Sequence, residues 1–133
     1  MDFSEQLSQF ASRISRLKDS IATEEATKTS LILPFFQLLG YDIFNPFEFV
    51  PEFTADIGTK KGEKVDYAIL MSNDPIILIE AKPVNTELSH THTSQLYRYF
   101  SVTKARFAIL TNGIVSVFIL TLKRQIKWMP SLF

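Results

Sequence analysis

The sequence predicts an α/β fold in which a mixed central sheet is flanked by helices. Two amphipathic helical stretches occupy the first 40 residues, and three strand-like runs follow between residues 47 and 82. A polar helix, expected over 87–102, then precedes two further β-rich runs. The order helix, helix, three strands, helix, two strands implies an α/β sandwich.

The N-terminal stretch, residues 1–22, has the periodicity of one amphipathic helix. Its apolar residues are spaced alternately by four and three positions, as a single helical stripe requires. They are Phe3, Leu7, Phe10, Ile14, Leu17 and Ile21. Two roles remain open for this stripe: packing on the domain that follows, or a seam to a partner chain.

A second helix is expected from Thr23 to Leu39. Thr23 is a suitable N-cap, and Gly40 provides the usual helix stop. Pro34 lies inside this stretch and lacks a backbone N–H, so we expect it to kink or divide the helix.

Three strands are expected next. Two prolines in the segment 45–57 favour an edge strand around 47–57. A longer loop should join it in a hairpin to the run 65–71, and a tight Ser-Asn-Asp turn then leads to 75–82. The run 75–82 is strongly apolar, which predicts a central, buried strand.

After the polar helix, the runs 105–111 and 114–120 predict a second hairpin. They meet at Asn112-Gly113, a dipeptide typical of hairpin turns.

Composition limits the classes of function. The 133 residues, 46% of them hydrophobic, suit one domain with one core. Fourteen basic and fourteen acidic residues balance, which argues against a strongly cationic surface for non-specific nucleic-acid binding. The absence of cysteine excludes disulfides and thiolate metal sites. No apolar run approaches the ~18 residues that span a bilayer, so we expect a cytoplasmic chain without a membrane partner.

Charged residues end the central strand on one of its faces. Alternation places Glu80 and Lys82 on the same face, and antiparallel pairing across the preceding turn should bring Asp66 beside Glu80. Two converging carboxylates suit Mg²⁺, which prefers oxygen ligands. Lys82 could orient or help deprotonate a bound water and offset charge on a phosphate. The alternative is an ordinary ion pair of Asp66, Glu80 and Lys82 at the sheet margin.

Other polar residues could extend this site. Glu24 and Glu25 begin the second helix, where they either compensate its dipole or point toward the metal. Gln95 and Tyr99 are spaced i, i+4, so both point the same way. Gln95 could then bond a phosphate or the carboxylates, while Tyr99 braces the strand of Glu80 or is simply a core aromatic.

Several chemistries lack their motifs. The sequence contains no glycine-rich phosphate loop, so no nucleotide cofactor is expected, and no GxSxG elbow.

Four runs together resemble the N-terminal nuclease domain of type I restriction enzyme R subunits, of the PD-(D/E)xK superfamily. They are EEATKTSLILPFFQLLGYDIFNP, VPEFTADIGTKKGEKVDYAIL, PIILIEAK and QLYRYFSVTKARFAILTNG, and the match covers about 23–115.

The resemblance implies a restriction-endonuclease-like αβββαβ core that cuts DNA with Mg²⁺, or Mn²⁺ as a substitute. Asp66 and Glu80 would be the metal ligands and Lys82 the lysine that orients water. Glu24 would match the helix glutamate of the family, and Gln95 with Tyr99 its QxxxY motif.

The chain departs from this family in two ways. The helicase motor domains of R subunits are missing, so translocation is not carried over. Related proteins continue after Thr111-Asn112-Gly113 with a different run of residues. A gene that encodes that run would encode residues 116–133 of this chain if one base were lost and the reading frame shifted. We therefore expect a single nuclease-like domain whose residues 116–133 are a frameshifted tail, with 116–120 still able to form an edge strand.

The leading interpretation is a Mg²⁺-dependent DNA endonuclease domain of a restriction system. The alternatives are a catalytically silent nuclease-fold module that binds DNA or protein, and a truncated fragment without activity. The expected protein partners are a second copy of the chain, bound through the first helix, or other restriction-modification subunits.

Overall fold

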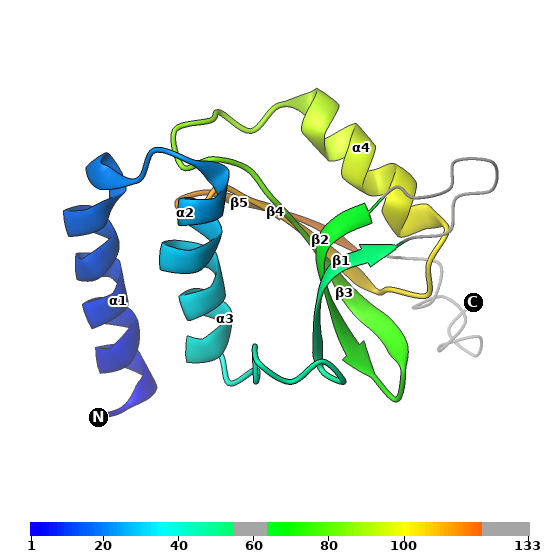
Figure 1. The fold of residues 1–133 in the computed structure, drawn as a ribbon, viewed down its shortest axis with the longest axis horizontal. Coiled ribbons are helices and arrows are strands. Elements are labelled where there is room, and N and C mark those ends of the chain that lie inside the picture. The colour runs from blue at the N-terminus through cyan, green and yellow to red at the C-terminus, as the bar shows by residue number, and fades with distance from the viewer. Residues whose placement is uncertain (55–63, 121–133) are drawn as a thin grey trace, which may run out of the picture.

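A five-stranded mixed sheet forms the centre of the protein. The computed structural model describes residues 1–54 and 64–120. The strand order is β1-β2-β3-β4-β5, and every neighbouring pair is antiparallel except the parallel pair β3 and β4. The mixed sheet and its flanking helices confirm the predicted α/β class (Figure 1). The strands are β1 (Phe49–Thr54), β2 (Lys64–Met71), β3 (Asp74–Ala81), β4 (Phe107–Thr111) and β5 (Ser116–Leu120).

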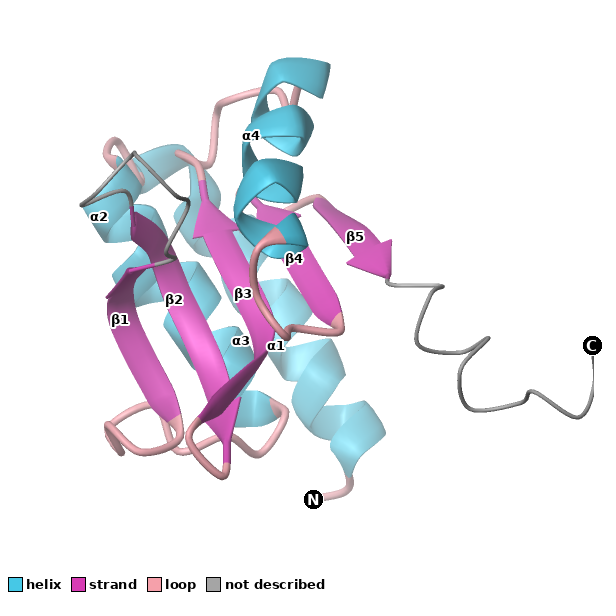
Figure 2. Cartoon of the chain, turned by 90° about the vertical axis from the view of Figure 1, so that its right-hand side faces the viewer, coloured by secondary structure: helices cyan, strands magenta, loops and turns pink. Residues whose placement is uncertain are grey.

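Helices cover both faces of this sheet. Figure 2 shows α4 over one face and α1 to α3 on the opposite face. The helices are α1 (Phe3–Leu17), η1 (Lys18–Ser20), α2 (Glu24–Thr27), η2 (Lys28–Ile32), α3 (Leu33–Leu38) and α4 (His90–Ser101). Within the described ranges, none of them combines the length and hydropathy that a bilayer crossing requires.

The N-terminal helix α1 forms as predicted but packs loosely. None of its residues is fully buried, and Phe3 and Leu7 remain 51% and 41% exposed. The ring of Phe10 lies 6.0 Å from that of Phe35 on α3. Part of the apolar stripe therefore packs on the domain, and part of it faces solvent.

The second predicted helix runs without a break from α2 to α3, and its middle part is the π-helical turn η2. The Thr23 hydroxyl caps its start by accepting a hydrogen bond from the Ala26 N–H at 3.0 Å. Pro34 follows the π turn in the first turn of α3, where a missing N–H is tolerated. At the end, Gly40 (φ +105) and Tyr41 donate to the carbonyls of Gln37 and Phe36, which is a Schellman motif.

The hairpins also follow the expectations. β1 lies at the sheet edge and pairs with β2, while the loop expected between them lies outside the described residues. Ser72 and Asn73 both have positive φ and form the two-residue turn between β2 and β3.

The second hairpin closes with a four-residue loop, 112–115, because Thr111 pairs with Ser116. The side-chain oxygen of Asn112 accepts from the Ile114 and Val115 N–H groups, which shapes this loop. β5 is the opposite edge strand, as expected for 116–120, and the rest of the suspected tail lies outside the described residues.

The sheet separates two hydrophobic layers. On one side, Leu96, Tyr99 and Phe100 of α4 pack on Leu78 and neighbouring residues of the sheet. The second layer lies on the opposite side, where η2 and α3 pack, and it contains Ile32, Phe36, Phe49, Tyr67, Ile69, Ile79 and Ala81. Residues of the central strand β3 are buried in both layers, as its apolar sequence predicted.

Candidate active site

The register of β2 and β3 brings Asp66 and Glu80 together. Ala68 pairs with Leu78 and Tyr67 with Ile79, so the next position along places Asp66 across from Glu80. The Asp66 N–H donates to Glu80 Oε1 at 3.1 Å, and the Ala81 N–H donates to Asp66 Oδ2 at 2.7 Å. Each side chain thus binds the backbone of the opposite strand, and the two carboxyl groups meet as the sequence predicted.

The backbone is irregular where this pair lies. Val65 belongs to the core layer under α4, whereas Tyr67, two residues along the same strand, belongs to the layer under α3. The alternation of β2 is therefore interrupted at Asp66. On β1, Glu52 lies between the paired residues Pro51 and Phe53 and has φ +52, which is unusual for a non-glycine residue.

Burial and Asp66 favour the protonated form of Glu80 at pH 7. Glu80 is only 8% exposed, and this burial is the main cause that raises its pKa to about 8. A hydrogen bond with Asp66 and the negative charge of Asp66 raise the pKa further.

Asp66 stays ionised beside its neutral neighbour. Burial acts to raise its pKa, but hydrogen bonds with Glu80, the Ala81 N–H and Lys28 outweigh burial and hold the pKa below its ordinary value. The two groups therefore share one proton, as neighbouring carboxylates do when both cannot ionise.

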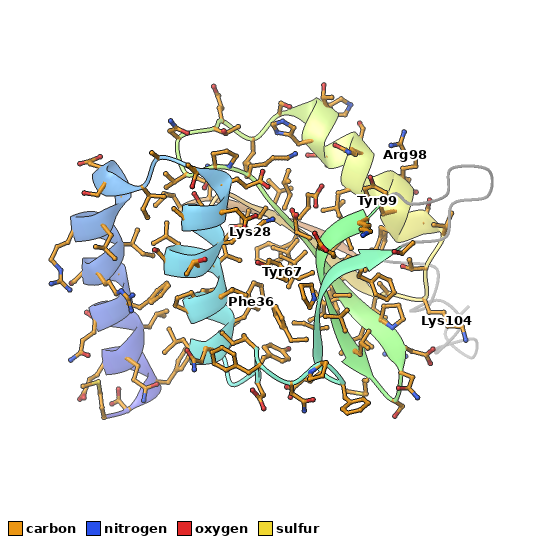
Figure 3. The ribbon with its side chains drawn as sticks, in the orientation of Figure 1. Lys28, Phe36, Tyr67, Arg98, Tyr99 and Lys104 are labelled. Atoms are coloured by element: carbon orange, nitrogen blue, oxygen red, sulfur yellow. The ribbon has the colours of Figure 1, made fainter. Side chains whose placement is uncertain are left out.

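The residue that sequence reasoning missed is Lys28, at the start of η2. Its Nζ lies 2.9 Å from Asp66 Oδ1, 3.2 Å from Glu25 Oε1 and 3.4 Å from Glu24 Oε2, and its side chain is 13% exposed. Burial alone would lower the pKa of Lys28, yet the contact with Asp66 holds the pKa above its ordinary value. Figure 3 shows Lys28 above the ring of Tyr67, at 5.8 Å from the ring centroid.

A weak signal for Lys28 was present in the sequence. It lies four residues after Glu24 and three after Glu25, which is the spacing of a helical ion pair. Such pairs usually lie on an exposed surface, and only the packing of α2 against the end of β2 reveals the third partner.

Glu24 and Glu25 are linked to the carboxylate pair through Lys28, which forms ion pairs with both of them and with Asp66. The side chain of Glu24 is 39% exposed and that of Glu25 83% exposed, so Glu24 is the more covered of the two. Neither forms a hydrogen bond with Asp66 or Glu80 within the part of the chain that the structure describes.

Thr27 holds this helix against the sheet. It is fully buried, and its hydroxyl donates to the Thr23 carbonyl at 2.9 Å and accepts from the Val84 N–H at 3.0 Å. The start of α2 is thereby tied to the segment that follows β3.

Lys82 directly follows β3 and is half-buried. Its N–H donates to the Thr111 carbonyl at 2.9 Å, which extends the pairing with β4. Among the described residues, no ion pair within 4.0 Å joins Lys82 to Asp66 or Glu80. The positive charge of Lys82 nevertheless lowers the pKa of Glu80 and so opposes the effect of burial. The ion pair of Asp66 is therefore made with Lys28 and not, as the alternative interpretation had it, with Lys82.

Gln95 and Tyr99 lie on α4 with the predicted common orientation. Gln95 Nε2 lies 3.5 Å from the Tyr99 hydroxyl, and Tyr99 is buried in the same core layer as Leu78 of β3. Figure 3 shows Tyr99 on the side of α4 that faces the sheet. Neither residue forms a hydrogen bond with Asp66 or Glu80 among the described residues.

The donor set is compatible with a divalent cation. Asp66 and Glu80 are two proton-sharing carboxyl groups, and replacing their shared proton with Mg²⁺ would relieve the repulsion between them. No group of three or more His, Cys, Asp and Glu side chains suited to a metal occurs within residues 1–54 and 64–120. Further ligands would then be waters, which Mg²⁺ ordinarily retains.

The fold and the site define an α/β protein with a nuclease-like core and a carboxylate pair at the junction of two antiparallel strands. The family described as the N terminus of the type I restriction enzyme R protein matches residues 23–132, and the chain belongs to this family. The match confirms the resemblance seen in the sequence and also includes residues 116–132. A search of curated proteins found none that matches the chain.

Proposed function

We propose that this domain is a Mg²⁺-dependent endonuclease of the PD-(D/E)xK type that hydrolyses DNA phosphodiester bonds. The observation that carries the proposal is the carboxylate pair of Asp66 and Glu80, which shares a proton and lies next to the half-buried Lys82. Membership of the restriction enzyme R protein family supports DNA as the substrate.

The residues of the site have distinct roles in this proposal. Asp66 and Glu80 hold the cation, which when bound supplies Lewis acidity and an activated water. Lys82 offers an ammonium group that orients the water and offsets charge on the phosphate. Tyr99 supports the strand that carries Glu80 from the side of α4, and Gln95, next to the Tyr99 hydroxyl, is the residue proposed to hydrogen-bond a phosphate or the carboxylates.

Cleavage of supercoiled plasmid tests the proposal. The intact chain is incubated with plasmid and Mg²⁺ or Mn²⁺, beside Lys82→Ala, Asp66→Asn and the exposed control Lys18→Ala. We expect the unmodified chain and Lys18→Ala to produce nicked or linear DNA. Lys82→Ala and Asp66→Asn should produce none, and EDTA should abolish cleavage by every protein. Equal cleavage by Lys82→Ala and the unmodified chain would identify a contaminant and contradict the proposal.

One observation favours a second candidate, a nuclease-fold module that binds DNA or protein without cutting. Lys28 already provides Asp66 with a positive partner at 2.9 Å, so the charge of this carboxylate is satisfied without a metal. Calorimetric titration with Mn²⁺ separates the two functions. Undetectable Mn²⁺ binding, together with retained DNA binding, would favour the module.

Protein partners follow from the same family membership. We propose that the domain acts with other subunits of a restriction-modification system, and that a homodimer through α1 is the alternative assembly. Sedimentation of the chain alone distinguishes them, because a homodimer forms without other subunits. Loss of the dimer in Phe3→Ser, at a side chain that is 51% exposed, would assign the contact to α1.

A further inference from the structure

We propose that Lys28 is the resident counter-ion of the carboxylate pair and sets its affinity for metal. In this view its ammonium occupies the side of Asp66 that a divalent cation needs, so metal binding requires Lys28 to release Asp66. The inference rests on the proposed function, because it concerns the same metal site. It assigns a positioning role to a residue outside the Asp, Glu and Lys of the sequence motif.

Both oxygens of Asp66 already have a partner, and the ammonium of Lys28 is the one that repels a cation. Oδ2 accepts the Ala81 N–H at 2.7 Å, a bond that holds the carboxylate to β3. Oδ1 receives the ammonium of Lys28 at 2.9 Å. A divalent cation on Oδ1 would lie within a few ångströms of this ammonium, and the two positive charges would repel each other strongly in a covered site.

Lys28 has other partners already within reach. Its Nζ lies 3.2 Å from Glu25 Oε1 and 3.4 Å from Glu24 Oε2. If Lys28 leaves Asp66, its charge therefore stays paired. Release of Asp66 removes one of three partners and keeps the two glutamates, which lie on the same continuous helix.

The backbone around Lys28 is fixed, so the side chain is the part that can move. Thr27, the preceding residue, is buried and hydrogen-bonded both to Thr23 and to Val84 beyond β3. Lys28 itself opens the π-helical turn η2, and such turns inside helices occur frequently at functional sites. The face of the Tyr67 ring, with its centroid 5.8 Å from Nζ, makes a cation–π contact with the ammonium.

Mn²⁺ binding without DNA tests the inference, because it needs no cleavage activity. Isothermal titration calorimetry compares the unmodified chain with Lys28→Met, which keeps the length of the side chain and removes its charge. Lys28→Arg keeps the charge, and Lys18→Met makes the same change at an exposed lysine. We expect Lys28→Met to bind Mn²⁺ about tenfold more tightly or better, since a repelling charge is gone. Lys28→Arg and Lys18→Met should bind like the unmodified chain.

A purely structural role for Lys28 would not give this result. Loss of a structural ion pair would loosen Asp66 and weaken metal binding. If Lys28→Met fails to fold, Lys28→Gln replaces it, because its amide can still donate a hydrogen bond to Asp66. Circular dichroism and thermal unfolding in EDTA establish that each variant is folded before titration.

The outcomes separate this inference from the proposed function. Tighter binding by the neutral variant, or binding by that variant alone, supports the role of Lys28. Equal or weaker binding by a folded neutral variant overturns it while leaving the metal site intact. Absence of Mn²⁺ binding in every variant overturns both this inference and the proposed nuclease function.

Discussion

Replacing Glu80 with glutamine should make the stability of the protein less dependent on pH. Glu80 is buried, and its pKa is raised to about 8 by burial first and then by Asp66, which favours the protonated form at pH 7. A glutamine has the same shape and is never charged. Its oxygen can accept the Asp66 N–H, and its amide can donate to the Asp66 carboxylate as the protonated Glu80 does.

The size and sign of the effect follow from proton linkage. Unfolded Glu80 ionises near its ordinary 4.5, whereas the folded protein keeps it protonated up to about 8. The folded state then binds more protons between these values, so the stability from Glu80 is fully present below pH 4.5 and is lost as pH rises through 8. The loss is about 2 to 3 kcal/mol between pH 5 and pH 7, and about 1 kcal/mol more by pH 9.

Asp66 does not add to the change in stability between pH 5 and pH 9. Its pKa is lowered, because hydrogen bonds and Lys28 outweigh burial, so its own contribution is lost only as pH falls below the ordinary value of 3.8. Of the two carboxyl groups of the site, Glu80 is therefore the one that makes stability depend on pH between pH 5 and pH 9.

Urea unfolding in EDTA at several pH values measures the effect. We expect Glu80→Gln and the unmodified chain to be about equally stable near pH 5, and the variant to be more stable by a growing margin above it. Glu87→Gln, at an exposed glutamate, is the matched control and should run parallel to the unmodified chain. A constant difference between Glu80→Gln and the unmodified chain from pH 5 to pH 9 would refute the reasoning.

Four further results are expected. Thr27→Val should cost about 1 to 3 kcal/mol of unfolding free energy in urea, because it leaves the half-buried Val84 N–H without an acceptor; an unchanged midpoint would show that water replaces the hydroxyl. Leu78→Ala, at a fully buried position of the central strand, should cost about 2 to 5 kcal/mol, and a loss under 1 kcal/mol would mean that the core layers collapse onto the gap. Gly113→Ala should destabilise by more than about 1 kcal/mol, since φ is +87 and the new Cβ would lie 2.8 Å from Leu31 Cδ1; equal thermal midpoints would contradict this. Mn²⁺ binding at pH 7 should release close to one proton from Glu80, read as a dependence of the binding enthalpy on buffer, and no dependence would place the metal elsewhere.

Much of the architecture could be read from local patterns in the sequence. Hydrophobic spacing predicted α1, and a capping threonine with a terminal glycine predicted the bounds of the second helix. The short turn at Ser72-Asn73 starts the pairing of β2 with β3, and a one-residue register shift between Ile69 and Leu70 then brings Asp66 across from Glu80 and not from Ile79. These features depend on residues close in the chain, which is why a sequence can predict them. The catalytic roles of Asp66, Glu80 and Lys82 remain predictions.

The tertiary structure decided what lies against the carboxylate pair. Lys28 precedes Asp66 by 38 positions, and only the packing of α2 on the sheet, secured by Thr27, brings its ammonium within 2.9 Å. Folding also buries Glu80, and this burial raises its pKa. Pairing between neighbouring strands is a local property, whereas the charge state of a site depends on every group that folding brings near it. The sequence alone thus determined which carboxylates meet, and the three-dimensional fold determined which positive charge balances them.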